Sequence, residues 1–198
     1  MRAGDAAGEM AVSRRSFLRR SAIVGGLALP FTIAGREVLA APAEARAAAA
    51  PLRFLTVDEA TDLERLGEAL VPGSATAGLA HYLDHQLACP AADSMLMARY
   101  LGVAPPFGEF YRGALGAVRE ALAAGTGDAA SRVRDLAGAL QRAFTGAPLP
   151  GWAGPPAGLV YFVLRSDAID VLYGTPDGFA RLGVPYMAHI HPPARWGE

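Results

Sequence analysis

The chain has 198 residues, of which 52% are hydrophobic and 19% are charged. This length suits one globular domain and is short for two, and the apolar share is large enough to build a sizeable core. From residue 48 onward, 11 arginines face 15 acidic residues, which gives a net charge of −4. A mildly acidic body of this kind excludes proteins that bind nucleic acid through a basic surface.

The N-terminal segment carries an export pattern. Residues 13–19 read Ser-Arg-Arg-Ser-Phe-Leu-Arg, which matches the twin-arginine signal S-R-R-x-F-L-K with arginine at the lysine position. The mildly apolar stretch over residues 21–34 is too short, and too interrupted by two glycines and a proline, to span a bilayer as a permanent helix. Small residues then favour cleavage between Ala40 and Ala50. The residues expected to be read by the Tat translocase are Arg14, Arg15, Phe17 and Leu18.

We therefore predict that residues 1–47 are a twin-arginine signal peptide with its linker and that residues 48–198 form the exported domain. Twin-arginine export carries proteins that are already folded, typically around a cofactor or a partner. The chain has no C-x-x-C-H haem site, no cysteine set for an iron–sulfur cluster and no G-x-G-x-x-G loop after a strand. We expect no cofactor in this chain and a cofactor on a partner that is exported with it.

Helical spacing of apolar residues dominates the exported domain, and no strand pattern persists. The clearest helix start is Thr56, which forms a capping box with Glu59. We predict an all-α single domain of about five or six helices, followed by an irregular C-terminal arm. The expected helices cover residues 56–70, 77–88, 93–101, 107–124, 128–144 and 156–173.

The arm begins after Gly174 and is rich in proline, glycine and aromatic residues. It is too apolar for a solvated terminus and too broken for a helix, so we expect it to lie against the protein's own helices or against another protein. If the arm is extended, His189 and His191 point to the same side, because side chains alternate along a strand.

Candidate catalytic and metal-binding groups are sparse. His81 and His85 are four residues apart on a predicted helix and form a possible pair of zinc ligands, but no third ligand is evident. Asp167 and Asp170 are three apart on a helix, which is typical of a solvated face. Cys89 is the single cysteine, so it is either a buried thiol or a link to another subunit.

Several segments resemble a known family. They are Tyr161-Phe162 followed by Leu164-Arg165, the run over residues 166–174, the Gly-x-Pro-Tyr turn at 183–186 and the run that begins with Tyr111-Arg112. In these segments the chain resembles the small subunit, called subunit 3 or gamma, of membrane-associated FAD-dependent gluconate 2-dehydrogenase and related sugar dehydrogenases. The family's usual acidic-aromatic-Gly-Gly-Asn turn is replaced here by Gly-Thr-Pro-Asp-Gly at 174–178, which suggests a subgroup.

The resemblance implies a non-catalytic accessory subunit. Its partner is a large FAD-dependent dehydrogenase of the glucose–methanol–choline type, often joined by a multihaem cytochrome c with haem c. The complex oxidises a sugar or sugar acid on the periplasmic side of the inner membrane, and the small subunit supplies the export signal and aids folding and stability. The expected partner-binding residues are Tyr161, Phe162, Tyr173, Phe179, Tyr186, Met187, His189, His191 and Trp196.

Two other functions are compatible with the residues. The first is a free-standing exported metal-binding protein or hydrolase that uses His81, His85, His189 and His191. The second is a structural helical protein of the periplasm with no dehydrogenase partner.

Overall fold

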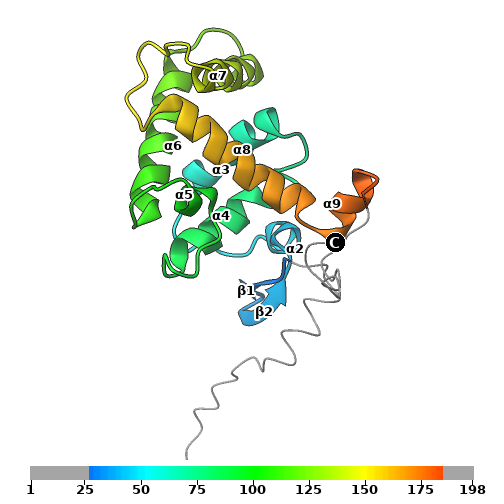
Figure 1. The fold of residues 1–198 in the computed structure, drawn as a ribbon. Coiled ribbons are helices and arrows are strands. Elements are labelled where there is room, and N and C mark those ends of the chain that lie inside the picture. The colour runs from blue at the N-terminus through cyan, green and yellow to red at the C-terminus, as the bar shows by residue number, and fades with distance from the viewer. Residues whose placement is uncertain (1–26, 185–198) are drawn as a thin grey trace, which may run out of the picture.

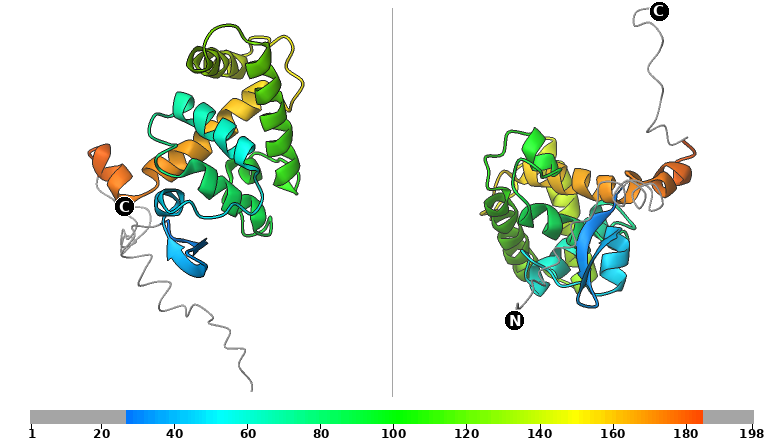
Figure 2. Two further views of the ribbon diagram at one scale, coloured as in Figure 1. Left: turned by 180° about the vertical axis from the view of Figure 1, so that it is seen from behind. Right: turned by 90° about the horizontal axis from the view of Figure 1, so that it is seen from below.

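A computed structural model describes residues 27–184 of the chain. Within this range the chain forms one β-hairpin and eight helices. The hairpin and α9 lie at the end of the body opposite α7 (Figure 2). In chain order the elements are β1 (Leu29–Ile33), β2 (Arg36–Ala40), α2 (Pro42–Ala47), α3 (Val57–Leu70), α4 (Leu79–Ala88), α5 (Met97–Tyr100), α6 (Phe107–Ala124), α7 (Ala129–Phe144), α8 (Ala157–Tyr173) and α9 (Pro176–Arg181).

Helix α8 runs through the middle of the body and contacts α3, α4, α5, α7 and α9 (Figure 1). Its sequence is apolar around most of its circumference, which is typical of a helix that other elements cover on several sides. Helices α3, α4 and α7, which contact α8, are amphipathic and bury one apolar face in the same core. The buried residues of α8 are Val160, Val163, Leu164, Asp167, Ala168, Val171 and Leu172.

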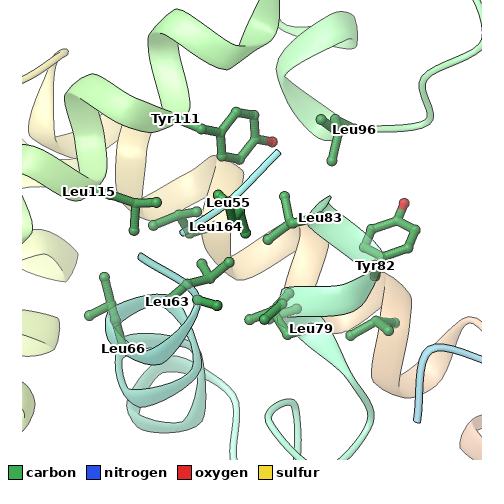
Figure 3. Close-up of a cluster of buried hydrophobic side chains, with 14 of the residues drawn as sticks. Leu55, Leu63, Leu66, Leu79, Tyr82, Leu83, Leu96, Tyr111, Leu115 and Leu164 are labelled. Carbon is green, nitrogen blue, oxygen red and sulfur yellow. The ribbon is translucent and has the colours of Figure 1, made fainter. Parts of the chain in front are cut away.

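The core is a cluster of leucine side chains from α3, α4 and α8, closed on one side by Tyr111 of α6 (Figure 3). Helices α3 and α4 approach closely at Gly67, where a Cβ atom would lie 2.2 Å from Cδ2 of Leu79. A larger residue at position 67 would therefore displace the Leu79 side chain.

The helix starts at Thr56 and Asp128 are confirmed. Thr56 Oγ1 accepts the backbone N–H of Glu59 at 3.2 Å, and the Glu59 carboxylate accepts the backbone N–H of Thr56 at 2.8 Å. Asp128 Oδ1 accepts the N–H of Ser131 at 2.9 Å. These caps satisfy N–H groups that have no partner inside the helix.

The helix expected over residues 93–101 is shorter in the structure and covers only Met97–Tyr100. The reason is that side chains from other helices take the backbone donors of this segment. Gln86 Oε1 of α4 accepts the N–H of Met95 at 2.8 Å, and Asp167 Oδ1 of α8 accepts the N–H of Met97 at 2.8 Å.

The prediction of a mainly helical domain is confirmed, but the fold is not strictly all-α, because β1 and β2 form an antiparallel hairpin in which Phe31 pairs with Val38. Ala34 and Gly35 connect the strands with φ of 50° and 72°. Positive φ at both turn residues matches the twist of a two-residue hairpin. The hairpin lies inside the range that the sequence assigned to signal peptide and linker.

The helix count and the arm also differ from the prediction, since α2 and α9 are additional helices. We expected an irregular arm from residue 174, but Thr175 caps a short helix by accepting the N–H of Gly178 at 3.0 Å. Pro176 stands in the first turn, where proline is compatible with a helix because no N–H bond is lost. Across residues 27–184, no helix combines the length and the hydrophobicity needed to cross a bilayer.

The segment that joins α2 to α3 is held by Asp84 of α4. This carboxylate is 3% exposed and accepts three backbone N–H groups, those of Arg53, Phe54 and Leu55, each at 2.8 Å. Such charge-assisted bonds offset the cost of burying the carboxylate and bring the start of α3 against α4.

We predict that Asp84→Asn lowers the free energy of unfolding by about 2–4 kcal/mol, because an amide keeps one acceptor and places an N–H₂ group against a backbone N–H. Urea denaturation followed by far-UV circular dichroism measures the change. Asp135→Asn, at an exposed position of α7, is the matched control and should leave the midpoint unchanged. Equal midpoints for both variants would contradict this role of Asp84.

Candidate functional site

The described residues contain four of the nine predicted partner-binding residues. Tyr161, Phe162, Tyr173 and Phe179 are all half-buried. They do not form one cluster, since Tyr161 and Tyr173 are twelve residues apart on α8, about 18 Å along its axis. The other five, and the export residues, lie outside the described residues: Tyr186, Met187, His189, His191, Trp196, Arg14, Arg15, Phe17 and Leu18.

The first pair belongs to an aromatic surface that we define as Phe144, Tyr161 and Phe162. The Phe144 and Phe162 rings stack with centroids 5.5 Å apart and planes 19° apart, and the Tyr161 ring lies 5.6 Å from Phe144. Phe144 is 51% exposed. Helical spacing put Phe144 on the apolar side of its helix. The helix end at Thr145 and Gly146 indicated that Phe144 lies at the edge of the core.

Gly158 brings the aromatic surface together. A Cβ atom at this position would lie 2.9 Å from the carbonyl oxygen of Ala143 and 2.9 Å from the Cα of Phe144. The first turn of α8 therefore rests directly on the last turn of α7. This close approach sets the ring of Phe144 against the rings that project from α8.

The second pair lies at the far end of α8. Tyr173 is the last residue of this helix and packs against the hydrophobic core with part of its ring exposed. Phe179 stands on α9, where its N–H donates to the carbonyl of Thr175 at 2.9 Å. These two residues are thus near the point where the described chain ends, at residue 184.

Asp167 corrects the prediction of a solvated acidic pair, because its side chain is completely buried. Tyr111 Oη donates to its Oδ2 at 2.5 Å, and the N–H of Met97 donates to its Oδ1 at 2.8 Å. Burial raises the pKa of Asp167 to about 7, although these two donors act in the opposite direction. Burial and the nearby Asp167 carboxyl raise the pKa of Tyr111 well above its usual value, so the phenol stays a donor.

This buried pair joins two of the segments that carry the family resemblance, the run from Tyr111 and the run over residues 166–174. Its inaccessibility argues for a structural role, since a buried carboxyl with both oxygens occupied offers no oxygen to a substrate. The sequence signal for burial was present in the apolar neighbours Val163, Leu164, Ala168 and Val171, which share its face of the helix at helical spacing.

His81 and His85 do share one face of α4, and the hairpin covers them. The ring of Phe31 meets both imidazoles edge to face, with centroids 6.3 Å from His81 and 5.7 Å from His85. His81 Nε2 lies 3.1 Å from the carbonyl oxygen of Ala50, while Nδ1 of each ring is buried without a hydrogen-bond partner. Burial, and then the charge of Arg53, hold the pKa of His85 below its usual value.

Metal binding by the histidine pair lacks further ligands in the part of the chain that is described. Between residues 27 and 184, no three His, Cys, Asp or Glu side chains are grouped as metal ligands. Cys89 is half-buried, and its thiol donates to the carbonyl of Gln86 at 3.1 Å. Burial raises the pKa of this thiol, which keeps it in the less reactive protonated form.

A polar cavity of about 400 Å³ lies between α3, α6 and α7, and the sequence did not indicate it. Its main feature is an ion pair in which Nε and Nη2 of Arg119 contact Asp62 Oδ2 at 3.0 and 2.9 Å. Arg65 and Arg132 also line the cavity. Since both partners of the pair come from different helices, the contact joins α3 to α6 at the surface.

Comparisons with protein-family models, with curated proteins and with solved structures return no match to this chain.

The burial of Asp167 leads to a prediction about pH. Its pKa of about 7 in the folded protein lies above the value of 3.8 expected when it is exposed, so between these values the folded state binds more protons than the unfolded chain. The stabilisation is complete at low pH and is lost as the pH rises through 7. We expect the stability of Asp167→Asn, relative to the parent, to rise by about 2–4 kcal/mol between pH 4 and pH 7.5.

Urea denaturation of both proteins at several pH values measures this difference. The pKa of His85 is lowered in the folded protein, so protonation of this imidazole at acidic pH favours the unfolded chain. Its effect on stability is therefore opposite in sign to that of Asp167. This contribution is common to both proteins and cancels in the comparison. A difference that stays constant with pH would contradict the raised pKa of Asp167.

Proposed function

We propose that this protein is a non-catalytic accessory subunit of an exported dehydrogenase complex. Its partner is a large FAD-dependent subunit of the glucose–methanol–choline type, which oxidises a sugar or sugar acid on the periplasmic side of the inner membrane. A multihaem cytochrome c is a further candidate member of the complex. The small subunit carries the twin-arginine signal for both chains and stabilises the flavoprotein subunit.

The observation that carries this proposal is the aromatic surface of Phe144, Tyr161 and Phe162. Stacked aromatic rings that remain exposed are the residues that most often anchor protein interfaces, because they bury a large area with little loss of side-chain entropy. Phe144 is 51% exposed. The rings that it contacts, those of Tyr161 and Phe162, belong to the segment with the firmest family resemblance.

The separation of buried and surface residues along α8 supports the same proposal. Asp167 and the residues around it are buried and serve the fold, whereas Tyr161 and Phe162, in the first turns of the helix, keep part of their rings at the surface. A partner that binds the first turns of α8 therefore meets aromatic side chains held by a rigid helix. Rigid anchors of this kind lower the entropy cost of association.

The proposal is tested by purifying the tagged full-length chain from its native host. We expect a large chain to co-purify and to show the near-ultraviolet and blue absorbance bands of oxidised flavin, because the cofactor belongs to the partner. Substrate screening on that complex then identifies the sugar. A colourless chain that purifies alone would remove the dehydrogenase proposal.

We predict that Phe144→Asp lowers the recovery of the partner by roughly thirtyfold, the effect of losing an interface hot spot. Quantitative pull-down measures the recovery. Tyr100→Asp is the matched control, since Tyr100 is 67% exposed on α5 and lies outside the aromatic surface. Recovery that is equal for both variants and the parent would exclude the aromatic surface as the partner site.

A second prediction concerns export. Replacing both Arg14 and Arg15 by lysine should leave this chain and its partner in the cytoplasm, because the translocase reads the arginine pair. Fractionation followed by a dehydrogenase assay measures the result. Arg19→Lys is the control, since lysine is the consensus residue there, and it should export normally. Normal periplasmic activity in the Arg14/Arg15 variant would contradict shared export.

A further inference from the structure

Residues 27–47 are built into the folded body. The face of the hairpin that contains Leu29 and Phe31 is turned inward, and these two side chains are 9% and 6% exposed. Phe31 packs against both imidazoles of α4. The strands are in register from Leu29–Ala40 to Ile33–Arg36, and a two-residue turn closes them.

Helix α2 ties the same segment to the rest of the protein. Ala45 is completely buried, and the α2 residue Arg46 binds Glu64 of α3 through Nε at 2.8 Å and Nη2 at 3.1 Å. Gly78 lies so close to the carbonyl carbon of Pro42 that a Cβ atom there would be 2.3 Å away. The hairpin before the expected cleavage region is therefore packed on α4, and α2 within that region is packed on α3 and α4.

The small-residue patterns that favour signal cleavage end at Ala40 and Ala47. In the structure Ala40 is the last residue of β2 and is 5% exposed, whereas Ala47 is exposed at the end of α2. Proteolysis requires an accessible and locally flexible chain, which regular structure packed on a core does not offer. Because the twin-arginine route transports folded proteins, the signal peptidase meets the bond after Ala40 inside the packed hairpin. It meets the exposed bond after Ala47 at the end of a helix that is already bound to α3 and α4.

We infer that residues 27–47 belong to the mature protein and that any removal of the export signal takes place N-terminal to Leu27, not between Ala40 and Ala50. Cleavage in the latter region would withdraw Leu29 and Phe31 from the core and uncover His81 and His85. The export step itself rests on the proposed function, whereas the place of the hairpin in the fold does not.

The first test is the N-terminus of the protein recovered from the periplasm of its host, determined by intact mass and N-terminal sequencing. A first residue at or before Leu27 is the expected result, and one between residues 28 and 51 overturns the inference. If the chain is found only in the cytoplasm, the export proposal fails separately, and the second test decides whether the hairpin belongs to the folded domain.

The second test compares Phe31→Ala with Glu37→Ala in the purified full chain. Phe31 is buried against α4, whereas Glu37 is exposed on the neighbouring strand. We expect Phe31→Ala to lower the thermal midpoint by about 10 °C and Glu37→Ala to leave it unchanged. If Phe31→Ala does not fold, Phe31→Leu gives a smaller fall of the same sign. Identical midpoints for the Phe31 variants and the parent overturn the inference.

Discussion

The hydrogen bonds at Asp167 join three parts of the chain that are distant in sequence. Its carboxyl group is held by Tyr111 of α6 and by the N–H of Met97 at the start of α5, which lie 56 and 70 positions away. A buried carboxyl without these donors would be costly in either protonation state. Helix α8 can therefore occupy only one rotation about its axis, because each step of one residue turns a side chain by about 100°.

The rotation of α8 about its axis also determines which of its side chains are exposed at the surface. Tyr161 and Phe162 stand on the same helix as Asp167, so the buried carboxyl orients the exposed rings indirectly. Gly158 then decides how closely α7 approaches, and with it the place of Phe144. The aromatic surface is thus a product of the core and not of a flexible loop, which explains how two rings of α8 remain packed against Phe144 of α7 in contact with solvent.

Local signals in the sequence predicted the helices well where side chains cap them, as Thr56 and Asp128 do. They failed at the hairpin, because five alternating residues beside a twin-arginine pattern are equally typical of an export segment. They also failed at Asp167, because two acids three apart usually face water. Burial there depends on Tyr111, and contacts over such a separation leave no local pattern. Most of the proposed arm anchors lie beyond residue 184.

The cavity of about 470 Å³ between α2 and α9 is lined by Leu27 at one end of the described chain and by Arg181 near the other. The two ends of the folded body are therefore neighbours. Probes attached at Leu27 and at Arg181 would therefore report on the same small region of the surface.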